Sequence, residues 1–231
     1  KYFITKYLPM KPLRRFVKTH KVLQTSVARI LTIQIVSAIH YIHSKEIFLR
    51  DVSSENIFIT SEGKAKISCF KHSTNDKTSQ GLHGHFFYQA LEVISGEVYD
   101  STADWFSLGV CLYEMVMGHT PLENHCWRHN IEFRSLDSYG KIVVLLNCTY
   151  YIPQVFPEDL KQALEGLLSK DPTKRLGYKD DWNTFKNHPF FSRIDWKALE
   201  KGILTAALPH REEVLSRNKF KISPPQSRFT F

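Results

Sequence analysis

The sequence predicts a mainly helical α+β domain that carries one small β-hairpin. Residues 101–118 are apolar nearly all round, which is typical of a helix buried at the centre of a domain. Residues 26–44 place apolar side chains at helical spacing and predict a second helix. Two short strand-like segments, 56–60 and 65–68, are joined by a turn that contains Gly63, and this spacing predicts the hairpin.

The rest of the chain contains segments that predict one more strand, one more helix and two loops. Residues 2–8 indicate a short strand, and residues 71–86 are polar and contain glycine, so we expect a mobile loop there. We also expect a loop rich in Pro, His and Asn between the central helix and an apolar stretch at 139–146. A further helix is expected to start near Pro157, a residue suited to a first helical turn, and to end by Lys170.

Length and composition are those of one large domain, or of one domain with a tail. The chain has 231 residues, of which 42% are hydrophobic and 13% aromatic, enough for a substantial core. From Phe191 onward the chain is mixed and contains Pro209, Pro224 and Pro225, so we expect this part to run over the surface. No internal repeat is evident.

The net charge of +8 arises from 31 basic and 23 acidic residues. Charge alone permits nucleic-acid binding, but no basic motif interleaved with aromatic residues supports it, so no nucleic-acid partner is expected. A solvated basic surface, or a dock for acidic protein partners, is the better interpretation.

We expect neither a membrane span nor a structural metal. No stretch approaches the ~20 apolar residues of a span, and the first residues lack the pattern of a secretory signal. The four cysteines are far apart, which favours free thiols in a reducing compartment, and with them a cytoplasmic location that leaves the nucleus open. Residues 125–129 hold two histidines and a cysteine, but a zinc site needs a second ligand pair, so an ordinary loop is expected.

The chain carries six further motif-like segments, at residues 43–59, 66–71, 90–92, 104–110, 167–177 and 188–191. In this order they resemble the C-lobe of a protein kinase. The first is similar to the catalytic loop, the second lies where the Asp-Phe-Gly motif belongs, and the third is similar to Ala-Pro-Glu. The later segments resemble the buried central helix, the arginine segment that follows it, and a motif of the AGC group of serine/threonine kinases, which includes ribosomal-protein kinases.

The resemblance covers roughly residues 2–210 and implies a division of the chain. Residues 1–12 are expected to be the last N-lobe strand and the hinge, residues 13–191 the C-lobe, and residues 192–231 an AGC-type C-terminal extension. No Gly-rich loop, strand lysine or C-helix segment precedes this part, so the N-lobe is expected to be absent from this chain.

The resemblance also implies the site residues. Asp51 stands at the proton-acceptor position, Arg50 would hold the loop, and Asn56 stands at the position of a magnesium ligand. Phe58 would pack beneath an adenine ring or simply fill that space. A structural alternative stays open, in which Asp51 and Asn56 only hydrogen-bond a loop.

Other positions depart from the family pattern. Ser53 stands where the family carries a lysine that contacts the transferred phosphate, and losing that cation removes transition-state stabilisation. Cys69 stands at the metal-aspartate position, although a neutral thiol is a poor ligand for Mg²⁺. Lys71 replaces the glycine of that motif, and Pro12 lies near the position of an acid for the ribose. His85 occupies the region of an activation-loop threonine.

Further positions that match the family have structural roles. Phe70 and Leu49 are expected to stack in an apolar spine, and Asp104 to hydrogen-bond the backbone of the catalytic loop. Glu92 and Arg175 are expected to form a buried ion pair.

Together these residues predict a pseudokinase-like lobe that binds other proteins, as a scaffold or regulator. The alternative is an active, unconventional serine/threonine kinase that uses Asp51 and Asn56 to transfer the γ-phosphate of ATP to protein hydroxyls. ATP and Mg²⁺ are expected as cofactors only under that alternative. A third possibility is an unstable truncation, because apolar surface on the side of a missing lobe would lack cover.

Overall fold

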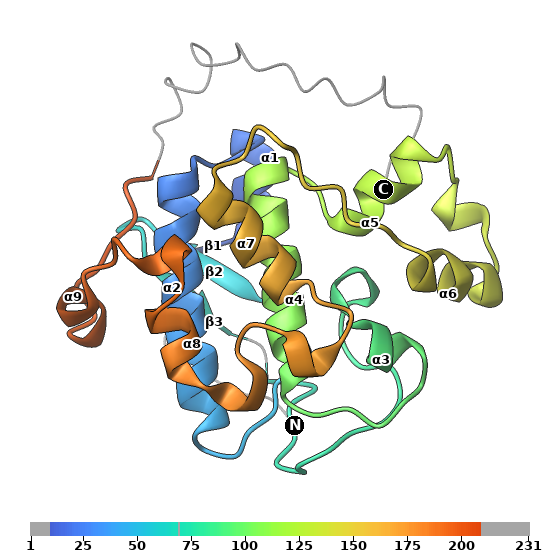
Figure 1. Ribbon diagram of the computed structural model, residues 1–231, viewed down its shortest axis with the longest axis horizontal. Coiled ribbons are helices and arrows are strands. Elements are labelled where there is room, and N and C mark those ends of the chain that lie inside the picture. Colours follow the sequence, from blue (N-terminus) through green and yellow to red (C-terminus); the bar gives the residue numbers. More distant parts are fainter. Residues whose placement is uncertain (1–9, 69, 209–231) are drawn as a thin grey trace.

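The computed structural model describes residues 10–68 and 70–208, and Figure 1 shows the arrangement of its elements. A small sheet and one long helix lie beside a central helix, and the shorter helices surround them. The strands are β1 (Met10–Pro12), β2 (Ile57–Thr60) and β3 (Ala65–Ile67), and the α-helices are α1 (Leu13–His20), α2 (Thr25–His43), α3 (Leu91–Ile94), α4 (Thr102–Met117), α5 (Pro121–Arg128), α6 (Ser138–Leu146), α7 (Glu158–Leu167), α8 (Trp182–Lys186) and α9 (Trp196–Glu200).

The sheet is antiparallel with the order β1-β2-β3, and it contains the predicted hairpin. Ile57 pairs with Ile67 across the hairpin, and Met10 pairs with Thr60 across β1 and β2. The sequence does not predict β1, because Pro12 removes a backbone donor at its end. The strand expected at residues 2–8 lies outside the described residues.

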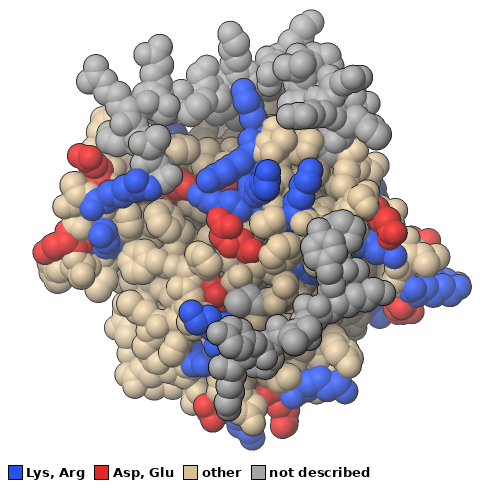
Figure 2. Space-filling model, turned by 180° about the vertical axis from the view of Figure 1, so that it is seen from behind, with Lys and Arg blue, Asp and Glu red and all other residues tan. Residues whose placement is uncertain are grey.

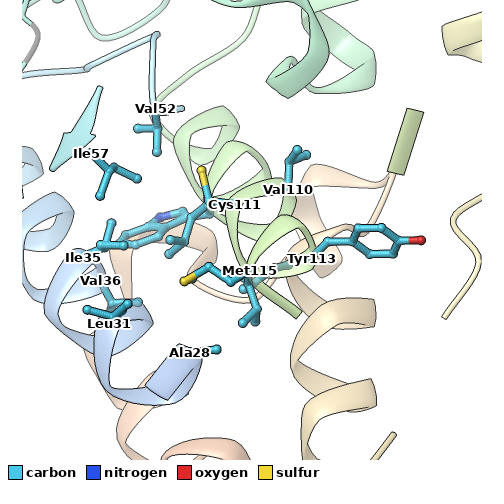
Figure 3. Packing of buried hydrophobic residues seen from close by; sticks show 14 of the residues in the cluster. Ala28, Leu31, Ile35, Val36, Val52, Ile57, Val110, Cys111, Tyr113 and Met115 are labelled. Carbon is cyan, nitrogen blue, oxygen red and sulfur yellow. The ribbon is translucent and has the colours of Figure 1, made fainter. Parts of the chain in front are cut away.

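Helix α4 is the centre of the core, as its apolar composition predicts. All of its residues except Ser107 are buried. It lies between α2 and α7, and its Cys111 and Met115 face Ile35 and Leu31 of α2 (Figure 3). A helix that is enclosed on all sides cannot vary its orientation without opening cavities, so α4 fixes the positions of the loops that start from it.

Helix α2 has the length and composition of a membrane span, with 19 residues and a mean hydropathy of 1.3. It also contains Arg29, Gln34 and other polar residues, so it is a weak candidate and does not contradict the expectation of no membrane span. Its residues Val27, Leu31, Ile35 and Ile39 are buried against the rest of the lobe. A buried, apolar helix of a domain core passes the same test of length and composition, so α2 is at most weak evidence for a membrane.

Several helices lie where the sequence indicates none, among them α1 and α5. Helix α1 starts directly after Pro12, and α5 occupies the segment expected to be a loop. A capping box begins α5, because the Thr120 hydroxyl accepts from the Glu123 N–H while the Glu123 carboxylate accepts from the Thr120 N–H. The pattern Thr-Pro-x-Glu is a known signal for a helix start, and it outweighs the Asn and His residues that indicate a loop.

The C-terminal part of the described chain returns to the hairpin. The Ala206 N–H donates to the Gly63 carbonyl at 2.9 Å, and Gln34 of α2 donates to the Leu204 carbonyl at 2.8 Å. Ala206 and Phe191 are buried. The expected surface course of the chain after Phe191 is therefore only partly correct, because this segment also covers the end of the sheet.

Candidate functional site

The catalytic-loop segment is held by Asp104, the first acidic residue of α4. The N–H groups of Leu49 and Arg50 each donate to one carboxylate oxygen of Asp104 at 2.9 Å. Arg50 has a φ of 62°, and its guanidinium donates to the His72 carbonyl. Because α4 is rigidly packed, these bonds place the Asp51 side chain at a fixed point beside the loop 71–86.

Asp104 also binds the ring of His43. Its Nε2 lies 2.9 Å from Asp104, and its Nδ1 lies 2.6 Å from Asp180, which also accepts from the Trp105 indole N–H. Burial opposes protonation of the ring, but the two carboxylates outweigh it and raise the pKa of His43 to about 9. Sequence reasoning does not find Asp180, which lies 137 residues beyond His43.

His85 lies directly on the carboxylate of Asp51. Its backbone N–H donates to Oδ1 of Asp51 at 2.9 Å, and its ring Nδ1 lies 3.0 Å from the same oxygen. Gly84 permits this approach, because an added Cβ would lie 2.5 Å from that oxygen. Asp51 itself is buried, with 8% of its surface exposed.

The pKa values of this pair move in opposite directions. Burial works against ionisation of Asp51, but the hydrogen bonds from His85 outweigh it and hold the pKa of that carboxyl below its usual range. The hydrogen bond to Asp51 is the main reason that the pKa of His85 is raised. The pair therefore favours a carboxylate and an imidazolium.

Ser53 and Asn56 complete the loop. Ser53 is fully buried, and its hydroxyl lies 3.3 Å from Nδ1 of His85. The Asn56 side chain donates to the backbone carbonyl of Asp51 at 3.0 Å. The structure thus brings Asp51, Ser53, Asn56 and His85 together, and His85 is the one whose contact with Asp51 the sequence does not indicate.

The residues expected to lie near a bound metal ion or adenine ring are more exposed than Asp51 and Ser53. Phe70 exposes 49% of its surface whereas Leu49 is buried, and their expected stacking stays a prediction. Phe58 is half-buried in β2, opposite Pro12 and Lys66. Cys69 lies outside the described residues. Within the described ranges, no group of three or more His, Cys, Asp or Glu side chains could hold a metal ion.

Glu92 and Arg175 form a paired, buried contact. The two guanidinium nitrogens donate to the two carboxylate oxygens at 2.8 and 3.1 Å, and Arg175 also donates to the Thr102 carbonyl. This two-point geometry joins the segment after the activation loop to the segment after α7. It is the arrangement that the resemblance to protein kinases implies for these two residues.

A second ion-pair network lies beneath the catalytic loop and has no counterpart in the sequence predictions. Arg14 of α1 donates to Glu114 of α4 at 2.9 Å and to Glu123 of α5 at 3.0 Å. The Tyr88 hydroxyl donates to Glu114 at 2.6 Å and lies 2.8 Å from the Ser54 hydroxyl. Burial lowers the pKa of Arg14, but Glu123 and Glu114 outweigh it, so the net shift is upward.

These features define the C-lobe of a protein kinase: a buried central helix that holds the catalytic loop, and a glutamate paired with a distant arginine. The protein kinase domain family matches residues 1–191, so the chain belongs to that family. Its resemblance to AGC serine/threonine kinases is confirmed by the relatives it matches.

Those relatives are serine/threonine-protein kinases Sgk1. The Bos taurus protein is 34% identical over 202 residues, which are 86% of this chain and 44% of that protein. The Homo sapiens and Danio rerio proteins are 33% and 32% identical over 229 residues, which are 97% of this chain and 50% of each relative. The chain therefore spans about half the length of the relatives it matches.

Proposed function

We propose that this lobe is catalytically impaired and acts by binding other proteins, as a scaffold or regulator. The observation that carries the proposal is the contact between His85 and Asp51. The carboxylate that would accept the substrate proton receives two donors from His85 on one oxygen. A substrate hydroxyl would have to displace an ion-paired ring to reach that oxygen.

The neighbouring positions support the same interpretation. Phosphoryl transfer depends on cations that neutralise the transferred group, and Ser53 is a buried neutral residue at the lysine position. By sequence, Cys69 offers no carboxylate to a magnesium ion. What the lobe keeps is its framework: the Asp104 contacts and the pair of Glu92 with Arg175.

The test is a thermal melt with and without millimolar ATP and Mg²⁺, on the longest natural protein that carries this lobe. A ligand at ~100 times its dissociation constant adds about 2.7 kcal/mol to the folded state. We expect no Mg²⁺-dependent shift. The variant with Ser53→Lys, Cys69→Asp and Lys71→Gly is the matched control and should gain a shift. A clear shift in the natural protein would contradict the proposal.

One observation favours an active, unconventional kinase instead. Asp51 and Asn56 remain joined in one loop, with the Asn56 amide 3.0 Å from the Asp51 carbonyl. Under this alternative the protein would transfer the γ-phosphate of ATP to protein hydroxyls, with Mg²⁺ held in part by Asn56. Activity that survived an Asp51→Asn change unaltered would count against it.

A further inference from the structure

We propose that a cavity beside the catalytic loop is a docking site for an acidic peptide segment of a partner protein. The cavity has a volume of about 420 Å³ and lies where α1, α5 and α6 meet the residues that follow His85. Its lining combines aromatic rings with basic side chains. The lining residues are Arg14, Phe86, Phe87, Glu123, Phe133, Arg134 and Lys141.

The single acidic side chain of the lining is ion-paired. Glu123 accepts from Arg14 at 3.0 Å and from the Thr120 N–H at 2.6 Å, so its carboxylate is committed to α1 and to the cap of α5. Arg14 is also bound by Glu114. The Arg14 guanidinium is shared between these two carboxylates, so the attraction for an incoming carboxylate has to come from the other cations of the lining.

Among the described residues, the remaining two cations of the lining have no such partner. With the residues that the structure describes, the side chains of Arg134 and Lys141 form neither an ion pair nor a hydrogen bond. Arg134 is exposed, and Lys141 is half-buried at the start of α6. Two free cations at the edge of one cavity give it a positive potential that attracts carboxylates. The planar guanidinium of Arg134 can also bind a carboxylate at two points.

The aromatic side chains give the site its apolar wall. The ring of Phe133 lies 6.0 Å from the ring of Phe86 and 5.4 Å from that of Phe87, both tilted. Phe133 is buried and holds the other two in place. An aromatic or aliphatic side chain next to an acidic residue would pack against this wall. The volume is in the range of ligand pockets, enough for a few side chains of a peptide.

A protein segment is the occupant that best fits the rest of the surface. On the face shown in Figure 2, the basic and acidic side chains of the described residues are interspersed with uncharged ones, so this face shows no continuous basic track for a nucleic acid. The site deepens the proposed function, because it names the chemistry of the partner. It also places that partner next to His85, the residue that covers Asp51.

The test measures binding of two short fluorescein-labelled peptides by fluorescence anisotropy. One contains Glu-Phe-Glu-Leu, and the other carries Gln in place of each Glu. We expect the acidic peptide to bind at least about tenfold more tightly and to lose that advantage in high salt. The double variant Arg134→Glu with Lys141→Glu should weaken its binding by about tenfold or more.

The matched control is the double variant Lys197→Glu with Lys201→Glu, which makes the same change in net charge at exposed positions away from the cavity. It should leave the affinity unchanged within about twofold. Equal binding of both peptides, an unchanged affinity in the Arg134 and Lys141 variant, or binding of ATP in place of the peptide would each overturn the proposal. All four changes are at positions outside the core, and thermal melts verify that each variant is folded.

A peptide-phosphorylation assay on the same samples separates this inference from the proposed function. Phosphoryl transfer together with cavity-dependent peptide binding would refute the impairment and leave the docking site in place. No transfer and no cavity-dependent binding would refute the docking site alone.

Discussion

The buried His43 makes the stability of the lobe depend on pH in a range where few other groups titrate. Its pKa is raised from 6.5 to about 9 because Asp104 and Asp180 outweigh the cost of burial. A raised pKa contributes stability that is fully present below the unfolded value of 6.5 and is lost as pH rises through about 9. One pKa unit corresponds to about 1.4 kcal/mol, so the full contribution is about 3 kcal/mol.

Between pH 7 and pH 9, about 2 kcal/mol of this contribution should disappear. Urea unfolding at a series of pH values measures it as a fall in the free energy of unfolding. The variant His43→Gln has no imidazole at this position, so its stability should be lower at pH 7 and should fall by about 2 kcal/mol less than that of the natural chain between pH 7 and pH 9. The variant His129→Gln, at the exposed end of α5, is the control and should keep the slope of the natural chain.

The result that refutes this reasoning is a His43→Gln variant with the same pH slope as the natural chain. Asp180, which pairs with His43, does not contribute to the slope above pH 7, because its pKa is lowered and its charge is constant in that range. Burial lowers the pKa values of His119 and His188, so these rings are neutral across the same range. His85 also has a raised pKa and adds to the slope of the natural chain. The part of the slope that the His43→Gln change removes therefore reports on His43.

Two further predictions concern the framework of the site. Glu92→Gln should leave the buried Arg175 cation uncompensated and destabilise the lobe by about 3–5 kcal/mol in urea unfolding, and a loss under about 1 kcal/mol would contradict the assigned pair. Gly84→Ala combines a φ of +79° with a Cβ 2.5 Å from Asp51, whereas Gly81→Ala at a φ of +85° meets no atom within 4 Å. Gly84→Ala should lower the free energy of unfolding by about 1–3 kcal/mol more than Gly81→Ala does. Equal losses in the two variants would show that the close approach of residue 84 to Asp51 is unimportant for stability.

The parts of the fold that the sequence predicts well are those set by local pattern. The apolar run of α4 and the Gly63 turn of the hairpin each depend on residues close together in the chain. The contact of Glu92 with Arg175 is also predictable, because a family pattern links two positions that are 83 residues apart. Contacts between distant residues that follow neither a periodic pattern nor a family pattern could not be predicted from the sequence.

The contact of Arg14 with Glu114 illustrates that failure. No periodic pattern joins residues 100 positions apart, and the pair exists only because β1 brings α1 against the end of α4. His85 is a similar case, because its approach to Asp51 depends on a loop conformation that Gly84 permits. Both contacts depend on tertiary geometry, and both place charged groups beside the catalytic loop.

The segment that returns to the hairpin is made late in synthesis, so the hairpin leaves the ribosome well before its bonding partners. The Gln34 amide donates to the carbonyl of Leu204, which is 170 residues later in the sequence. The Gly63 carbonyl accepts from the N–H of Ala206, which is also made much later. At roughly 5–20 residues per second, the ribosome needs about 10–30 s to make that span. During this interval the nascent lobe has its hairpin but not the segment that covers it. Chaperones therefore have a defined period in which to bind the open end of the sheet.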